Sequence, residues 1–297
     1  SIDSTREAFT ELGVSDHTLT DEQKRSLDEN GFLVYSPGPQ YLAKLGIDVL
    51  AMREVLDRLI HEEGWRGGCE GKEDWVSPER QLDPGSHRLT NLLDKHDLFR
   101  RMITIPEILA AVHHVIKDEI KAGPVDMREP RPGSGYQRVH IDWLPRTSEA
   151  EPHDCVFVGF YLDDMRKENG AIRVIPGTHK KTGWPDEYID IHVPHPDEVQ
   201  VEVPAGSFIV MNAHTWHAGA LNPTGGRRRT LYIDYRNRRL PQLLNQKKYL
   251  RPETLAKLSD LERYLLGVRD SDPAQAEDSL GPGAAYRAWL AKVKTTA

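Results

Sequence analysis

The spacing of apolar and polar residues changes near Gly123, and this change divides the chain into a helical part and a β-rich part. In residues 46–62 the apolar positions recur every three or four residues, which predicts an amphipathic helix. From residue 124 to about residue 237, short runs of β-branched and aromatic residues are broken by Pro, Gly, Asn and Asp, which predicts strands. We therefore expect a β core with helical segments before and after it.

Start and stop signals set the limits of the other expected helices. Thr20 is a candidate N-cap and Gly31 a candidate helix end, so a short helix should precede a first strand, GFLVY. Pro106 suits the first turn of another helix. The expected helices are residues 20–32, 46–62, 90–102, 106–121, 252–268 and 283–294.

The β-rich part contains six runs of strand character. They are YQRVHIDWL (136–144), CVFVGFYL (155–162), AIRVI (171–175), VQVEV (199–203), SFIVM (207–211) and TLYIDYR (230–236). Short strands at such spacing are typical of antiparallel sheets in a sandwich or barrel. Because no repeat or low-complexity linker interrupts the sequence, residues 1–297 are expected to form one domain, with helical parts 20–121 and 240–297 packed on the core.

Composition narrows the function classes. Of the 297 residues 38% are hydrophobic and 29% charged, as in ordinary globular proteins. The formal net charge of −7 argues against a nucleic-acid binder, which usually carries a basic stripe. No run approaches the roughly 20 apolar residues of a membrane helix, and no signal peptide is visible, so we expect a cytoplasmic protein without a membrane partner. Two isolated cysteines, Cys69 and Cys155, make neither a disulfide framework nor a thiolate metal site.

The stretch QRVHIDW, residues 137–143, is the first candidate for chemistry. On a strand, His140 and Asp142 would point to the same face. Two histidines and one carboxylate hold iron(II) and leave coordination positions open for other ligands. The second histidine must come from elsewhere, and His214 and His217 are both candidates. Taken alone, a His-x-Asp pair is more often two polar residues on a solvated surface.

Four stretches of the chain, in this order, resemble the phytanoyl-CoA dioxygenase-like family of iron(II)/2-oxoglutarate oxygenases. They are LTDEQKRSLDENGFLVY, PGSGYQRVHIDW, FYLDDMRKENGAIRVIPGTHK and VPAGSFIVMNAHTWHAGALNPTGGRRR, and they span roughly residues 19–236. The resemblance implies a mostly β protein with flanking α-helices and a double-stranded β-helix core of the jelly-roll, cupin-like kind. It also implies iron(II) as the metal, with 2-oxoglutarate and dioxygen as cosubstrates.

The resemblance assigns roles to individual residues. His140 and Asp142 take the family's His-x-Asp positions, and His217 is the histidine of its W-H-x-G pattern, so these three become the expected metal ligands. His214 remains the alternative to His217.

The expected 2-oxoglutarate contacts also follow from the resemblance. Arg228, eleven residues after His217, matches the arginine that binds the far carboxylate of the cosubstrate. A guanidinium suits this role because it makes a bidentate, charge-assisted pair with a carboxylate. The neighbouring Arg227 and Arg229 are not excluded. Thr230 would share a strand face with Arg228, and its hydroxyl is expected to contact the same carboxylate.

The expected reaction is hydroxylation of a C–H bond in a small-molecule metabolite or natural-product intermediate, with conversion of 2-oxoglutarate to succinate and CO2. Halogenating relatives carry a small residue at the position of Asp142, so this aspartate favours oxygenation. Desaturation, epoxidation, ring formation and hydroxylation of an acyl-CoA are alternatives. A non-catalytic jelly-roll binding protein would not need the metal ligands. A zinc hydrolase would not need Arg228, and its Glu-bearing helix motif is absent from the sequence.

Residues beside the metal motif are candidates for substrate contact. Tyr136 and Trp143 are expected to form an aromatic wall, with ordinary core packing as the alternative. Arg128 could meet an anionic substrate, or it could form an ion pair at a strand edge. The glycine-rich residues 64–71 form either a lid or a solvated loop. His179, in PGTHK, is expected to hydrogen-bond its own loop instead of a metal.

Overall fold

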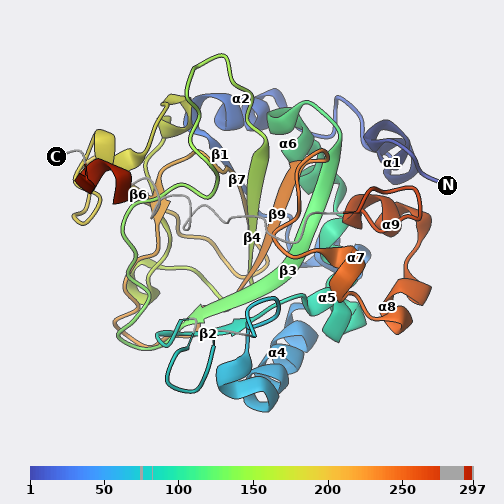
Figure 1. The fold of residues 1–297 in the computed structure, drawn as a ribbon, viewed down its shortest axis with the longest axis horizontal. Helices are drawn as coiled ribbons and strands as arrows, with labels where there is room; N and C mark the ends of the chain where they lie inside the picture. Colours follow the sequence, from blue (N-terminus) through green and yellow to red (C-terminus); the bar gives the residue numbers. More distant parts are fainter. Residues whose placement is uncertain (74–75, 82, 275–290, 296–297) are drawn as a thin grey trace.

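The computed structural model describes residues 1–73, 76–81, 83–274 and 291–295 of the chain. Its centre is a six-stranded antiparallel sheet with the strand order β1-β7-β4-β9-β3-β2 (Figure 1). The strands of this large sheet are β1 (Phe32–Tyr35), β2 (Ser86–Leu89), β3 (Ile120–Pro130), β4 (Cys155–Tyr161), β7 (Phe208–Asn212) and β9 (Thr230–Asn237).

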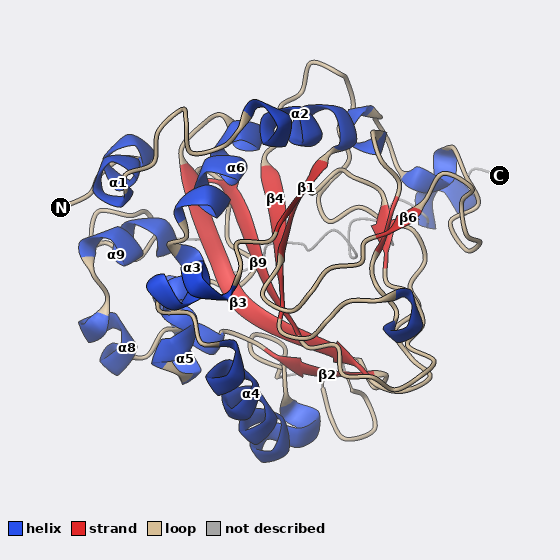
Figure 2. Ribbon diagram, turned by 180° about the vertical axis from the view of Figure 1, so that it is seen from behind, coloured by secondary structure: helices blue, strands red, loops and turns tan. Residues whose placement is uncertain are grey.

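A second, small sheet has the strand order β6-β5-β8. Its strands are β5 (Arg173–Val174), β6 (Val199–Gln200) and β8 (His217–Ala218). Figure 2 shows β6 on the opposite side of the view from most of the labelled helices, with the large sheet between them. The prediction of a β core made of antiparallel sheets is thus confirmed.

The helices are short, and most precede β3 or follow β9. They are α1 (Thr5–Leu12), α2 (Asp21–Asn30), α3 (Pro39–Lys44), α4 (Val49–Glu63), α5 (Leu92–Lys95), α6 (Pro106–Ile116), α7 (Gln246–Tyr249), α8 (Pro252–Lys257) and α9 (Asp260–Leu266). The predicted start of α2 is confirmed by a capping box between Thr20 and Gln23, and Gly31 ends this helix with φ of 83°. Within the described residues, no helix is long and apolar enough to cross a membrane.

The large sheet has two different faces. Val156, Val158 and Phe160 of β4 are fully buried in the main apolar cluster, to which helices α4 and α6 also contribute. Phe157 and Tyr161 alternate with them and point to the other face, where they line a cavity. The helical layer therefore covers one face of the sheet, and the functional side chains are found on the other.

Two predicted helices end earlier than their apolar spacing suggested. Residues 90–102 form α5 and a separate 3-10 helix, Asp97–Ile103, because His96 is extended and its Nδ1 accepts a hydrogen bond from the Leu98 N–H. Helix α6 ends at Ile116 instead of residue 121, because Lys117 adopts the left-handed conformation with φ of 58°. As a result β3 begins at Ile120, and the β core starts a few residues before the predicted position.

The carboxy-terminal helices differ from the prediction in a similar way. The expected helix 252–268 is divided into α8 and α9, because Leu258 is extended and Ser259 starts a new capping box with Glu262. Of the expected helix 283–294, residues 283–290 lie outside the described part of the chain, and residues 291–295 are helical. The apolar pattern did not reveal α1, α3 and β2.

The prediction that residues 136–144 form a strand is wrong. Of these residues only His140 pairs with a strand, through an isolated bridge to His217. The backbone N–H of Val139 donates to Ile191, whereas that of Asp142 donates to Ala213. The N–H of Gln137 donates to Gly219, so the segment has four separate backbone partners and no regular ladder. The predicted strands AIRVI and VQVEV are present, but only two residues of each are paired as a strand.

The core assignment can be tested at Phe208 of β7. Its ring lies 4.5 Å from Phe160 and 6.2 Å from Tyr35, measured between centroids. Phe208→Ala should lower the free energy of unfolding by about 3–5 kcal/mol, because it removes a buried ring and leaves a cavity. Val34→Ala on β1, where the side chain is 36% exposed, should cost less than about 1 kcal/mol. Urea unfolding measures both losses, and equal losses would contradict this core.

Candidate metal centre and its cavity

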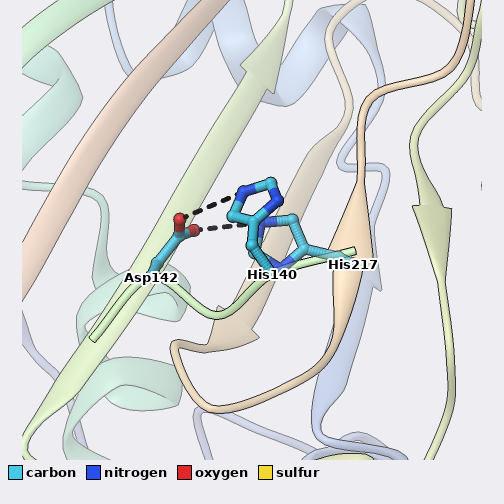
Figure 3. A group of neighbouring side chains, drawn as sticks. All are labelled: His140, Asp142 and His217. Carbon is cyan, nitrogen blue, oxygen red and sulfur yellow. Dashed lines mark ion pairs between the residues drawn. The ribbon is translucent and has the colours of Figure 1, made fainter. Parts of the chain in front are cut away.

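Three of the predicted side chains meet at one place. One ligand atom each from His140, Asp142 and His217 lie within 4.8 Å of one another, and no second such group of His, Cys, Asp or Glu side chains occurs among the described residues. The Asp142 carboxylate faces both rings, with Oδ1 3.6 Å from His140 Nε2 and Oδ2 3.1 Å from His217 Nε2 (Figure 3). Residues far apart in the sequence thus form one compact donor set.

Backbone hydrogen bonds hold these residues in position. The N–H of His140 donates to the His217 carbonyl at 2.9 Å, and the N–H of His217 donates back at 3.2 Å. The Asp142 N–H donates to the Ala213 carbonyl at 2.8 Å. The irregular segment that contains His140 and Asp142 is therefore fastened to β8 and to the loop before it.

The ring orientations determine which nitrogen atoms face the centre. His140 Nδ1 lies 2.9 Å from the Arg138 carbonyl, and His217 Nδ1 lies 2.9 Å from the Thr215 carbonyl. A carbonyl only accepts, so each Nδ1 carries the proton and each Nε2 presents its lone pair to Asp142. The Oδ2 atom of Asp142 is buried and accepts no hydrogen bond. Two lone pairs and a carboxylate that face each other fit a divalent cation.

Burial sets the charge states of this centre. It lowers the pKa of His140 to about 4, so this ring is neutral near pH 7. Burial opposes the ionisation of Asp142, but the adjacent His217 outweighs it and lowers the pKa of the carboxyl. Burial likewise opposes the protonation of His217, but Asp142 outweighs it and raises the pKa of this ring. A proton on His217 therefore competes with a metal ion for the same lone pair.

The centre lies in a cavity of about 250 Å³. His140, Asp142 and His217 line one part of it, and the large sheet contributes Phe157 and Tyr161 from β4. Further lining residues from the large sheet and the segments next to it are Arg88, Leu89, Asp126, Met127, Arg128, Arg228 and Tyr232. The cavity is thus formed between the inner face of the large sheet and the segments of the small sheet.

Carboxylates distinguish the three consecutive arginines. Arg227 pairs with Glu129 and, at 2.6 Å, with Asp57. Arg229 pairs with Asp163 at 2.7 Å and with Asp57 at 3.1 Å. Neither of these arginines lines the cavity. Both guanidinium groups are therefore already neutralised by the protein.

Arg228 differs from both neighbours. It lines the cavity, is only 3% exposed and donates to the backbone carbonyls of Gly170 and Ala220. Within the described part of the chain no carboxylate pairs with it, and its Nε has no hydrogen-bond partner. Thr230, two residues further on, is also buried, and its hydroxyl has no partner among the described residues. An unpaired buried guanidinium is costly, so this end of the cavity is suited to an anion.

The residues predicted to contact substrate lie in different places. Trp143 does not line the cavity, and its ring packs under the Arg236 guanidinium at 4.5 Å. Tyr136 borders an adjoining cleft, where its hydroxyl donates to the His192 carbonyl. Arg128 lines the cavity itself. The aromatic wall of the cavity is instead made by Phe157, Tyr161 and Tyr232.

Sequence reasoning missed these three aromatic residues, although a signal for them was present. Phe157 and Tyr161 alternate with Val156, Val158 and Phe160 in the run CVFVGFY, so they must share the opposite face of the strand. Tyr232 has the same relation to Arg228 and Thr230 along TLYIDYR and the residues before it. Assigning strand faces in both runs would have identified them.

The other histidines do not join the metal centre. His214 Nε2 donates to the Leu144 carbonyl at 2.8 Å, and its Nδ1 lies 2.8 Å from Nδ1 of His153. His179 Nε2 donates to the Asp28 carbonyl, so the prediction that this ring bonds its own loop is wrong: it holds its loop against α2. The ring centroid of His153 lies 5.9 Å from that of His179 and 5.1 Å from that of His214, so these three residues form a second histidine cluster.

Comparison with known proteins identifies the family. The sequence profile of the phytanoyl-CoA dioxygenase (PhyH) family matches residues 74–230, more than half of the chain. The chain belongs to this family. Among similar sequences, the iron/alpha-ketoglutarate-dependent dioxygenase ausO of Aspergillus calidoustus is 29% identical over 207 residues, which cover 66% of this chain and 68% of that protein. Dioxygenase af480 of Aspergillus fumigatus is 27% identical over 199 residues, which cover 63% of this chain and 60% of that protein.

Solved structures of related enzymes share the fold of this PhyH-family chain. HygX from Streptomyces hygroscopicus, with nickel and 2-oxoglutarate bound, has a TM-score of 0.57 at 18% sequence identity. The superposition covers 75% of this chain and 88% of the HygX chain. The non-haem, alpha-ketoglutarate-dependent carbocyclase SnoK from nogalamycin biosynthesis also has a TM-score of 0.57 at 18% sequence identity. The superposition covers 90% of this chain and 96% of the SnoK chain. The predicted jelly-roll core with flanking helices is confirmed. The predicted family is confirmed.

The choice between His217 and His214 can be tested by metal binding. His217→Ala removes a proposed ligand of the metal. It should lower iron(II) affinity by more than the roughly 10–100-fold that is typical when a residue hydrogen-bonded to a ligand is removed. His214→Ala removes only contacts to Leu144 and His153 and should largely preserve the affinity. Anaerobic calorimetric titration measures both variants, and the opposite order would assign the ligand to His214.

The second histidine cluster should make folding sensitive to acid. Burial, assisted by His214, lowers the pKa of His153 to about 3, and burial lowers the pKa of His214 to about 4. Between pH 6.5 and 4 the unfolded chain therefore binds protons that the folded chain excludes, so stability falls as the pH falls.

His153→Gln should reduce the stability loss between pH 7 and pH 5 by about 2 kcal/mol, since the ring stays neutral in the folded protein over this range. His17→Gln, at an exposed position, is the matched control and should leave the loss unchanged. Urea unfolding at the two pH values gives the comparison. A His153→Gln protein that loses as much stability as the wild type would refute this assignment.

Proposed function

We propose that this chain is an iron(II)/2-oxoglutarate-dependent oxygenase that hydroxylates a C–H bond of a small molecule. His140, Asp142 and His217 are the proposed metal ligands, and Arg228 with Thr230 the proposed site for the far carboxylate of 2-oxoglutarate. One observation carries the proposal. The same cavity contains a ligand group suited to a cation and a buried guanidinium, Arg228, suited to an anion.

The donor chemistry fits iron(II). Two imidazole nitrogens and one carboxylate oxygen are the ligands of the facial triad that leaves positions open for a 2-oxo acid and for dioxygen. When bound, iron(II) with dioxygen and 2-oxoglutarate supplies the oxidant for the C–H bond, while 2-oxoglutarate leaves as succinate and CO2. Asp142 supplies the carboxylate ligand at the position where halogenating relatives have a small residue, and this supports oxygenation over halogenation.

The other residues of the cavity position and shield the reactants. The Arg228 guanidinium is held by two backbone carbonyls, so its orientation is set before a carboxylate binds. Phe157, Met127 and Ile172 contribute apolar side chains to the lining, which limit the access of water. The cavity volume of about 250 Å³ supports a small substrate beside 2-oxoglutarate.

The function is tested by turnover. Purified protein with iron(II), 2-oxoglutarate and dioxygen should form succinate, and formation should increase with compounds from a panel of metabolites and natural-product intermediates. If the wild-type protein binds neither iron(II) nor 2-oxoglutarate, the proposal is overturned, and a non-catalytic binding protein with this fold is favoured.

The role of Arg228 gives a sharper prediction. Arg228→Gln should raise the KM for 2-oxoglutarate on the order of tenfold or more, because a charge-assisted bidentate pair is lost. Arg227→Gln changes a guanidinium that pairs with Glu129 and Asp57 outside the cavity, and it should leave this KM unchanged. Succinate formation at varied 2-oxoglutarate concentrations compares them. An effect of Arg227→Gln equal to that of Arg228→Gln would assign the carboxylate contact differently.

A further inference from the structure

Two further arginines lie next to each other on the inner face of the large sheet. Arg88 of β2 stands directly opposite Arg128 of β3 in the antiparallel register, and both line the cavity. Like charges directly opposite on neighbouring strands destabilise a sheet. Their juxtaposition therefore needs a compensating negative charge.

One carboxylate supplies part of this compensation. The Nε atoms of Arg88 and Arg128 each lie 3.0 Å from the same oxygen, Oδ2 of Asp83. Two guanidinium charges and one carboxylate leave a net charge of +1 at this place. Asp83 also fixes the orientation of both groups from one side.

The terminal nitrogens of both arginines are still available. A guanidinium has five N–H donors, and only the Nε–H of each is used here. Among the described residues, the hydrogen bonds of Arg88 and Arg128 are those from Nε to Asp83. The side chain of Arg128 is 11% exposed and that of Arg88 is 35% exposed, and both residues line the cavity. Donors on a cavity wall that the protein's own hydrogen bonds leave over can bind a ligand that accepts from them.

We propose that Arg88 and Arg128 form a second anion site, which binds a carboxylate or phosphate group of the primary substrate. This inference rests on the proposed function, because it takes Arg228 as the partner of 2-oxoglutarate. Two adjacent guanidinium groups, each oriented through its Nε, present a set of donors that matches the oxygens of either anion. The substrate is accordingly a small organic acid or phosphate ester, with the anionic end at β2 and β3 and the oxidised carbon toward the metal centre.

The remaining charges of this region agree with the proposal. Burial, with a contribution from Asp234, raises the pKa of Asp126 to about 7, so this carboxyl is only partly ionised near neutral pH. It lies on β3 two residues before Arg128, on the same face, and also lines the cavity. Lys72, an exposed residue, adds a positive charge to the lining. The substrate side of the cavity is therefore positive overall.

Anion binding can be measured without knowledge of the substrate. Full-length protein is loaded with nickel(II), which supports no turnover, and with saturating 2-oxoglutarate, and is then titrated calorimetrically with inorganic phosphate or with propionate. Wild-type protein should bind at least one of these probes. A preference for phosphate indicates a phosphate ester as substrate, and a preference for propionate indicates a carboxylic acid.

Single variants identify the site. Arg88→Gln and Arg128→Gln should each weaken binding of the probe on the order of tenfold, and each leaves Asp83 with one arginine partner. Arg58→Gln, which removes an exposed arginine of α4 paired with Glu62, is the charge-matched control and should have no effect. Thermal unfolding verifies that each variant is folded.

Two results would overturn the proposal. The first is probe binding that is absent in the wild type or unchanged in both cavity variants. The second is a loss of 2-oxoglutarate affinity in Arg88→Gln or Arg128→Gln as large as that in Arg228→Gln, which would assign the pair to the cosubstrate. Failure of the wild type to bind 2-oxoglutarate at all would contradict the proposed function itself, and the two failures are therefore distinguishable.

Discussion

Two reciprocal backbone hydrogen bonds between His140 and His217 are the constraint on which the rest of the site depends. They join an irregular segment to a two-residue strand, β8, and so bring together side chains that are 77 residues apart in the sequence. The backbone carbonyls of Arg138 and Thr215 then fix the ring tautomers, so that both Nε2 atoms face Asp142. The result is a set of electron-pair donors that repel each other until a cation or a proton lies between them.

Electrostatic pairing also separates the arginines of this protein by function. Arg227 and Arg229 are paired with carboxylates outside the cavity and connect β9 and the segment before it to α4 and to neighbouring loops. Arg228, between them, lines the cavity and has no carboxylate partner among the described residues. Arg88 and Arg128 are intermediate, since they share a single carboxylate. The guanidinium groups left without full compensation are the ones that line the cavity.

Local signals predicted some parts of this molecule better than others. The capping residue Thr20, the strands around Phe208 and Thr230, and the donors His140, Asp142 and His217 were accessible from the sequence, because each depends on nearby residues or on a motif of fixed spacing. The irregular path of residues 136–144 was not accessible, because its backbone partners come from three distant segments. Helix ends at His96 and Lys117 were missed since local side-chain and backbone conformations there override the apolar spacing.

The site shows the same division between local and tertiary information. Sequence alone left Arg227, Arg228 and Arg229 as alternatives, and only the positions of Asp57, Glu129 and Asp163 in the fold distinguish them. Trp143 looked suited to the pocket because it follows Asp142, but its ring packs on Arg236 instead. The pairing of Arg88 with Arg128 depends on the register of β2 and β3, and β2 itself was not predicted.

In the proposed function, the metal site and the Arg228 site bind the two ends of one 2-oxoglutarate molecule. The most direct test is an anaerobic titration of wild-type protein with 2-oxoglutarate, in the presence and absence of one equivalent of iron(II). We expect one iron per chain and a marked gain in 2-oxoglutarate affinity, with a new visible absorption band, only when iron is present. Equal 2-oxoglutarate affinity with and without iron, or no stoichiometric iron binding, would contradict it.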